Sequence, residues 1–302
     1  MPQASDAIPP PAQAVTAAAA APQLLPSERA RLPLDVARAL EEDLGDGDAT
    51  AALIDEDARG CARLTCKQAD AVLAGRDWFD TCFRALDPGM QIDWAAADGE
   101  RLSSGQVICR LAGRSRALLS AERSALNFLQ TLSATATRTA AFVQAVAGTR
   151  ARILDTRKTL PGLRLAQKYA VRCGGGHNHR IGLFDAVMVK ENHIAAAGSI
   201  AAIVERARRL HPQLLVIVEV EDMAELEQAI AAAADRILID DFALEDMRRA
   251  VQISAGRVPL EVSGGVDLES VRAIADTGVD CISIGGLTKH IEAVDFSLRA
   301  HG

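Results

Sequence analysis

The feature that most constrains the fold is a regular alternation of short apolar runs and helix-like segments through the second half of the chain. Six apolar runs each end in polar residues or glycines, and they lie in residues 153–162, 185–193, 214–221, 236–241, 258–265 and 281–286. Short continuous apolar runs bounded by turn signals are typical of parallel strands buried on both faces. The chain therefore predicts a buried parallel sheet whose strand ends carry its polar groups.

Segments with helical spacing separate these runs, and they cover residues 200–210, 223–234, 244–253 and 268–275. Strand and helix alternate with a period of about 22 residues, which is typical of right-handed βαβ units. We count about six units rather than the eight of a complete barrel. The predicted fold class is α/β, with an incomplete TIM-like α/β barrel; an open doubly wound sheet is the alternative.

The region before the barrel predicts a separate mixed α/β domain, since 302 residues are enough for two domains. We place the N-terminal α/β domain at residues 24–133, with residues 292–302 returning to it, and the barrel at residues 134–291. One long helix is expected to open at Ser120. A further helix, rich in small residues, is expected over residues 133–147 and ends at Gly148.

Residues 1–23 are rich in Ala and Pro and contain no Lys or Arg. They therefore lack the charged start of a signal peptide and the arginines of a transit peptide, and we expect a disordered tail. No apolar run approaches the roughly 20 residues that a membrane-spanning helix needs.

Charge and cysteine usage exclude several classes of function. The net charge of −7 argues against broad binding to nucleic acid or to an anionic membrane, so an anionic substrate needs a local cationic pocket. The six cysteines are scattered without a Cys-x-x-Cys pair, which favours reduced thiols in a cytoplasmic protein over a disulfide framework or a zinc site.

Cations gather where the first apolar run ends and in the glycine-rich segment that follows it. Arg157 and Lys158 follow the first run, and they are either exposed charges or part of an anion site. Downstream, three consecutive glycines precede His177, His179 and Arg180. The His-x-His spacing is compatible with a metal, but the adjacent arginine would repel a cation, so hydrogen bonding to an anion is favoured.

Three more charged residues end apolar runs. Lys190 needs a counter-charge or a chemical role if it is buried. Glu219 and Asp240 are either salt-bridge partners of the lysines or ligands of sugar hydroxyls, a metal or a developing cation.

The last two runs predict a phosphate site. Ser263, Gly264 and Gly265 end one run, and Ile284, Gly285 and Gly286 end the other. Backbone amides there, followed by helix amino termini expected at Asp267 and Thr288, would bind a phosphate as barrels of this class do. With the cations and the two carboxylates, this set suits two anionic substrates, one of them phosphorylated.

Three motifs carry a resemblance to a known family. They are Asp155-Thr-Arg-Lys-Thr-Leu-Pro-Gly-Leu, Gly174-Gly-Gly-His-Asn-His-Arg180 and Lys190-Glu-Asn-His193. Together with Glu41-Glu-Asp-Leu-Gly-Asp-Gly-Asp-Ala-Thr50 and Glu122-Arg-Ser-Ala-Leu-Asn127, they resemble quinolinate phosphoribosyltransferases. The resemblance covers essentially everything after the tail.

The resemblance implies a pentosyltransferase of NAD biosynthesis that is assembled as a homodimer, with a higher oligomer left open. Phosphoribosyl pyrophosphate, bound with Mg²⁺, is expected to react with the ring nitrogen of quinolinate. Pyrophosphate and CO₂ leave, and nicotinate mononucleotide remains. No nucleic-acid or membrane partner is expected.

The resemblance also implies roles for the residues singled out above. The quinolinate site is expected to comprise Arg123 from the neighbouring subunit, Arg157, His179, Arg180 and Lys190, and Thr156 is expected to be a substrate-binding residue. Lys158 is expected to meet the pyrophosphate, and Glu219 and Asp240 the ribose hydroxyls and Mg²⁺, mainly through the substrate. Ser263–Gly265 and the backbone of residues 284–286 are expected to hold the 5′-phosphate. The catalytic set is Lys158, Lys190, Glu219 and Asp240.

Three alternatives remain open from the residues. A Schiff-base aldolase could use Lys190 beside a phosphate site, although it has no need of two neighbouring arginines. A non-catalytic pyridine-carboxylate or nucleotide-binding protein would have little use for both Glu219 and Asp240. A related phosphoribosyltransferase for another aromatic acid is the third.

Overall fold

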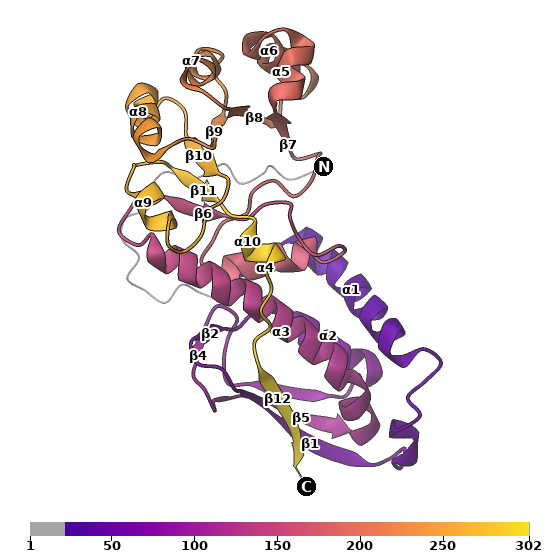
Figure 1. Ribbon diagram of the computed structural model, residues 1–302. Helices are drawn as coiled ribbons and strands as arrows, with labels where there is room; N and C mark the ends of the chain where they lie inside the picture. Colours follow the sequence, from indigo (N-terminus) through magenta and orange to yellow (C-terminus); the bar gives the residue numbers. More distant parts are fainter. Residues whose placement is uncertain (1–21, 302) are drawn as a thin grey trace. The chain divides into compact units, whose positions relative to one another are not determined.

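The computed structural model describes residues 22–301, and these form two compact units (Figure 1). Unit 1 comprises Ala141–Arg157 and His177–Gly286, and unit 2 comprises residues 22–140, 158–176 and 287–301. The predicted disordered tail, residues 1–23, lies outside the described residues except for its last two. Among the helices between residues 22 and 301, none is long and apolar enough to cross a membrane.

Unit 1 contains a six-stranded parallel sheet in the order β6-β11-β10-β9-β8-β7. Its strands are β6 (Arg152–Leu154), β7 (Ala186–Val189), β8 (Leu215–Val220), β9 (Arg236–Asp240), β10 (Leu260–Ser263) and β11 (Cys281–Ser283). From β7 to β11 each strand pairs with the next in sequence, and β11 then pairs with β6. In a doubly wound sheet the order of the strands reverses at a switch point. Here the strand order does not reverse between β7 and β11, which confirms the predicted incomplete barrel.

A short segment extends the sheet on the other side of β6. Leu154 forms an isolated parallel bridge with His177. The amide of His177 donates to the carbonyl of Ile153 at 2.9 Å, and the amide of Asp155 donates to the carbonyl of His177 at 3.1 Å. This bridge places the loop that carries His179 and Arg180 beside the end of β6.

Helices follow the strands of unit 1 along one face of the sheet (Figure 1). They are α5 (Glu191–Ala197), α6 (Ile200–Leu210), α7 (Met223–Ala231), α8 (Leu244–Ser254) and α9 (Val271–Ala275). Side-chain caps set two of the starts. Ser199 Oγ accepts a hydrogen bond from the amide of Ala202, and Asp222 Oδ1 accepts one from the amide of Glu225. The alternation predicted from the apolar runs is therefore confirmed.

The strands of unit 1 align their side chains in layers on the face opposite the helices. Glu219, Leu238 and Glu261 are in register across β8, β9 and β10. Asp240 and Ser263 are paired two residues further along their strands. Because side chains alternate along a strand, residues two apart lie on the same face. Asp240 and Ser263 thus form one polar layer at the carboxyl ends of β9 and β10, and Glu219 and Glu261 belong to the layer before it.

Unit 2 is built on an antiparallel sheet in the order β12-β1-β5-β3. The strands are β1 (Arg59–Cys66), β3 (Gln91–Trp94), β5 (Val107–Arg114) and β12 (Phe296–His301), and β2 (Ala71–Val72) pairs with β4 (Arg101–Leu102). The remaining elements are α1 (Pro26–Leu44), η1 (Ala51–Leu53), α2 (Arg76–Leu86), α3 (Ser115–Ala145), α4 (Arg164–Cys173) and α10 (Gly286–Lys289). Trp78, Phe79 and Phe83 of α2 are fully buried in its core.

Helix α3 corrects the prediction of two helices on either side of residue 133. It runs without a break from Ser115 to Ala145. Its small polar residues have their hydroxyls satisfied, since Thr139 Oγ1 donates to the carbonyl of Thr135 at 2.7 Å and Ser133 Oγ donates to that of Ala74. The domain boundary that we expected at residues 133–134 falls inside this helix. That these residues separate two domains stays a prediction.

Candidate active site

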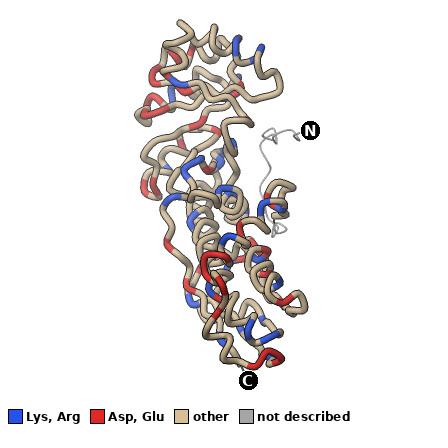
Figure 2. The backbone as a smooth tube through the Cα atoms, turned by 90° about the vertical axis from the view of Figure 1, so that its right-hand side faces the viewer, with Lys and Arg blue, Asp and Glu red and all other residues tan. Residues whose placement is uncertain are grey.

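The carboxyl ends of the six parallel strands of unit 1 share one edge, which we call the strand-end edge. Most of the predicted site residues lie in its last strand positions or just beyond: Thr156, Arg157, Lys190, Glu219, Asp240, Ser263, Gly264, Gly265, Ile284, Gly285 and Gly286. Acidic and basic segments are interspersed along the chain of both units (Figure 2). A local cluster of cations at this edge, rather than a basic surface, is therefore what an anion would meet.

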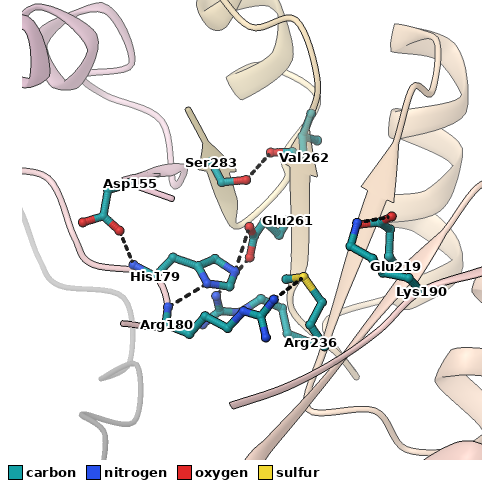
Figure 3. Close-up of polar contacts among 10 residues, drawn as sticks. Asp155, His179, Arg180, Lys190, Glu219, Arg236, Glu261, Val262 and Ser283 are labelled. Carbon is teal, nitrogen blue, oxygen red and sulfur yellow. Dashed lines mark hydrogen bonds and ion pairs between the residues drawn. The ribbon is translucent and has the colours of Figure 1, made fainter. Parts of the chain in front are cut away.

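Lys190 and Glu219 form an ion pair at the ends of neighbouring strands (Figure 3). The Nζ atom of Lys190 donates to both carboxylate oxygens of Glu219, at 2.7 and 2.6 Å. The lysine side chain is 44% exposed and the glutamate 11%, so the charged head of Lys190 reaches solvent. Glu219 is therefore the counter-charge of Lys190. Because the lysine is partly exposed, a charged ligand can replace Glu219 as its partner.

Arg180 is half-buried near the exposed Arg157. Its guanidinium donates to the carbonyl of Ala186 at 3.4 Å and to the sulfur of Met188 at 3.5 Å. Burial lowers the pKa of Arg180 and the charge of Arg157 lowers it further, while Asp185 and Glu219 raise it. The charge of Arg157 thus acts on Arg180, and planar guanidiniums are well suited to carboxylates.

His179 is buried at 7% exposure and is held by contacts on three sides (Figure 3). Its amide donates to Asp155 Oδ1 at 2.8 Å, and its Nδ1 accepts from the amide of Arg180 at 2.7 Å. Its Nε2 lies 3.3 Å from Glu261 Oε1. The expected hydrogen bond from His179 to a substrate carboxylate stays a prediction that these contacts do not favour.

Two buried carboxylates that sequence reasoning did not single out hold this loop. Asp155 is fully buried, and its Oδ2 accepts from the side-chain amide of Asn178 at 2.7 Å. Glu261 is also fully buried, and its Oε2 accepts from Arg236 Nη1 at 3.0 Å. Burial by itself raises the pKa of Glu261, but His179 and Arg236 outweigh it and lower the pKa to about 2. Glu261 could have been singled out from the sequence, because it is a charged residue inside the apolar run 258–263.

The glycines after β10 bring the backbone close to Asp240. Gly264 has φ +100°, and a Cβ added there would lie 3.3 Å from Asp240 Oδ1. The expected helix amino termini at Asp267 and Thr288 are wrong, because α9 begins at Val271 and α10 at Gly286. Asp267 instead accepts amide hydrogen bonds from its own turn. Phosphate binding here would therefore depend on the glycine backbone rather than on a helix dipole.

Arg123 and Lys158 belong to unit 2, so the structure does not place them against the strand-end edge. Arg123 is exposed on α3, and Lys158 is exposed directly after Arg157. The backbone carbonyl of Lys158 accepts a hydrogen bond from Thr288 Oγ1 at 2.8 Å. Their contribution to the site stays a prediction.

Within residues 22–301 no group of three or more His, Cys, Asp or Glu side chains could hold a metal ion by itself. A cavity of about 340 Å³ lies on the sheet of unit 2, where Arg63, Lys67 and Arg299 line it together with small residues. None of the candidate site residues lines that cavity.

Comparison with known families decides the assignment. Residues 48–133 match "Quinolinate phosphoribosyl transferase, N-terminal domain", and residues 135–299 match the C-terminal domain of the same family. The chain belongs to the quinolinate phosphoribosyltransferase family. The motifs around Arg157, Arg180 and Lys190 that carried the resemblance all lie within the matched C-terminal domain.

Relatives in this family align along most of the chain. A probable nicotinate-nucleotide pyrophosphorylase (carboxylating) of Bacillus subtilis is 41% identical over 258 residues, which are 85% of this chain and 89% of that protein. The Mycobacterium leprae nicotinate-nucleotide pyrophosphorylase is 45% identical over 213 residues, covering 70% and 75% of the two chains. The solved nicotinate-nucleotide pyrophosphorylase of Francisella tularensis is 47% identical, with a TM-score of 0.87 over 90% of this chain and 96% of that one.

Proposed function

We propose that this chain is a nicotinate-nucleotide pyrophosphorylase (carboxylating). In the proposed reaction the ring nitrogen of quinolinate forms a bond to the anomeric carbon of phosphoribosyl pyrophosphate, and the bond from that carbon to the pyrophosphate oxygen breaks. The bond between the ring and its 2-carboxylate then breaks, CO₂ leaves, and a solvent proton replaces it. The products are nicotinate mononucleotide, pyrophosphate and CO₂.

The observation that carries this proposal is the position of Arg180 and Arg157 together with Lys190 at the strand-end edge. Quinolinate has two carboxylates, and a pair of guanidiniums with an ammonium suits a dicarboxylate better than a monocarboxylate. Family membership supports the same substrate. His179 and Thr156 border this group, and Arg123 is proposed to join it from the partner subunit.

The carboxylates and glycines of the same edge suit the second substrate. Glu219 and Asp240 are proposed to bind the ribose hydroxyls and to stabilise positive charge at the anomeric carbon as the leaving group departs. Ser263–Gly265 and the backbone of residues 284–286 are proposed to hold the 5′-phosphate, and Lys158 to meet the pyrophosphate. Catalysis is then positioning and charge stabilisation without a covalent enzyme intermediate.

The residues present fit Mg²⁺ bound together with the substrate. Mg²⁺ usually keeps several waters and is held by one or two carboxylates plus substrate phosphates, and the edge offers Glu219 and Asp240. When bound, Mg²⁺ would neutralise the charge that develops on the leaving pyrophosphate. Asp240 is the better candidate for a direct ligand, because Glu219 already binds Lys190.

We further propose that the chain is a cytoplasmic homodimer whose two sites each use Arg123 of the other protomer. The exposure of Arg123 on α3 supports this. All six cysteines are free thiols and five of them are buried, which suits a reducing compartment.

A competition assay tests the substrate assignment. The purified protein is incubated with phosphoribosyl pyrophosphate, Mg²⁺ and equal concentrations of quinolinate and nicotinate, and nicotinate mononucleotide is followed with isotopically labelled acids. The proposal predicts that the product derives from quinolinate. Product derived mainly from nicotinate would indicate a related transferase for a monocarboxylate, and binding without pyrophosphate release would indicate a non-catalytic protein.

A further inference from the structure

Glu261 lies on β10, in register with Leu238 of β9, and contacts two groups from different parts of unit 1 (Figure 3). Its Oε2 accepts a hydrogen bond from Arg236 Nη1 on β9 at 3.0 Å. Its Oε1 lies 3.3 Å from Nε2 of His179, which belongs to the loop after the His177 bridge. A fully buried carboxylate is costly to the fold unless its charge is matched, so its presence calls for a role.

The contacts of His179 determine which ring nitrogen carries the proton. Its Nδ1 accepts a hydrogen bond from the amide of Arg180 at 2.7 Å, so that nitrogen is unprotonated. The proton is therefore on Nε2, which faces the Glu261 carboxylate. Glu261 thus selects the tautomer that allows His179 to hold the backbone of Arg180.

The position of the Arg180 guanidinium depends on these contacts of His179. The amide of His179 is bonded to Asp155 Oδ1 at 2.8 Å, and the amide of Arg180 is bonded to the His179 ring, so two consecutive backbone amides are anchored. The side chain of Arg180 then reaches the carbonyl of Ala186 on β7. A displacement at residue 179 would move this guanidinium relative to Arg157.

We infer that Glu261 is a positioning residue for substrate binding, which sets the place of Arg180 through the His179 ring. This inference rests on the proposed function only in naming quinolinate as the anion that Arg180 binds. Glu261 itself is fully buried and touches no substrate in this account.

The role requires two negatively polarised oxygens at position 261, one bonded to Arg236 and one 3.3 Å from His179 Nε2, which a carboxylate has and an amide has not. In Glu261→Gln the amide oxygen must turn to Arg236, because a guanidinium only donates. The amide NH₂ then faces His179 Nε2 and moves the ring proton to Nδ1, where it opposes the amide of Arg180. Replacing Arg236 with Met in the same chain frees the glutamine oxygen to face His179 Nε2, as the carboxylate oxygen does in the unmodified protein.

The test measures the affinity of the full-length protein for quinolinate and for phosphoribosyl pyrophosphate by calorimetry. Glu261→Gln should weaken quinolinate binding by about tenfold or more and change donor binding by less than about twofold. The double variant Glu261→Gln, Arg236→Met should recover quinolinate affinity although it is the less stable protein. The matched control is Glu28→Gln, which alters an equally buried carboxylate paired with Arg172 in unit 2 and should leave both affinities unchanged.

Equal losses for both ligands, no loss for either, or a double variant weaker than the single one would overturn the inference. Nitrogen-15 chemical shifts of the His179 ring in the unmodified protein provide a readout that needs neither variant nor activity. A proton on Nε2 agrees with the inference, and a proton on Nδ1 contradicts it. If the unmodified protein binds no quinolinate, the proposed function fails instead, and the ring measurement still decides the role of Glu261.

Discussion

The ammonium of Lys190 lies within 2.7 Å of both carboxylate oxygens of Glu219, across the ends of two neighbouring parallel strands. A lysine that attacks a carbonyl must be an uncharged amine, and a neighbouring carboxylate stabilises the ammonium instead. The ion pair thus argues against the Schiff-base aldolase, as family membership does. The ion pair also keeps Lys190 positively charged at the strand-end edge, where a substrate carboxylate can take the place of Glu219.

Borohydride treatment in the presence of a phosphorylated aldehyde or ketone, the substrate class of a Schiff-base aldolase, should leave Lys190 unmodified, because its ammonium is held by Glu219. Replacing Lys190 with Ala should lower kcat by about a hundredfold, since a positioned charge is lost and Glu219 is left without its partner. Mass spectrometry checks the first outcome and steady-state kinetics the second. A substrate-sized adduct on Lys190 would restore the aldolase alternative.

Arg157→Ala should raise the KM for quinolinate by about ten- to hundredfold, because a charge-assisted hydrogen bond to a carboxylate is lost. The KM for phosphoribosyl pyrophosphate should change far less. Steady-state kinetics with each substrate varied in turn gives both constants. Arg206→Ala, which removes an exposed arginine of α6, is the matched control and should change neither. Equal effects of Arg157→Ala on both constants would contradict the assignment.

Gly264→Ala should raise the KM for the ribose donor and leave that for quinolinate nearly unchanged. The added Cβ would lie 3.3 Å from Asp240 Oδ1, at the backbone proposed to hold the 5′-phosphate. Gly256→Ala is the control, since Gly256 also has a positive φ (+75°) but a Cβ there meets nothing within 4 Å. Both changes should cost about 1 kcal/mol of stability for the left-handed backbone. An unchanged donor KM in Gly264→Ala would remove these glycines from the phosphate site.

Mixing two inactive variants tests the shared site of the proposed dimer. Arg123→Ala and Lys190→Ala homodimers are exchanged under mild denaturation, and activity is measured in the mixture. Every heterodimer would carry one site with both residues intact, so partial activity should return. Exchange is verified with differently tagged chains. Absence of recovery despite verified exchange would show that Arg123 does not act across the interface.

The charge on Glu261 should make stability depend on pH in the acid range. Its pKa is lowered from 4.5 to about 2, so its contribution to folding is fully present above pH 4.5 and is lost as the pH falls toward 2. A shift of this size corresponds to about 3 kcal/mol of unfolding free energy. The unfolding free energies of the unmodified protein and of Glu261→Gln, measured with urea, should therefore converge as the pH falls from 4.5 toward 2. A difference that does not change with pH would contradict the paired carboxylate, and Glu227→Gln, at an exposed position, is the control.

The parallel sheet of unit 1 could be predicted because its strands are buried on both faces and so appear as continuous apolar runs. The polar residues that end those runs, such as Lys190, Glu219 and Asp240, had to share one edge once the strands were parallel. The contact between Lys190 and Glu219 was among the alternatives weighed from the sequence. Choosing it over a chemical role required the coordinates.

Other features depend on information that is not local in the chain. Glu261 lies within an apolar run, and its partners His179 and Arg236 come from other runs, so only strand register reveals the buried pair. Helix α1 begins at Pro26 and passes through Pro33, although proline in a helix interior usually ends or kinks the helix. Helix α3 continues through small polar residues that intrinsic propensity disfavours, because packing and hydrogen bonds within unit 2 outweigh that preference.

The most direct measurement uses quinolinate labelled in its 2-carboxylate, with phosphoribosyl pyrophosphate and Mg²⁺. Labelled CO₂ and pyrophosphate are followed in the same reaction. If basic side chains and carboxylates at the strand-end edge bind both substrates together, one CO₂ is released for each pyrophosphate, and the unlabelled product is nicotinate mononucleotide. Pyrophosphate release without labelled CO₂, or neither product, would contradict the account.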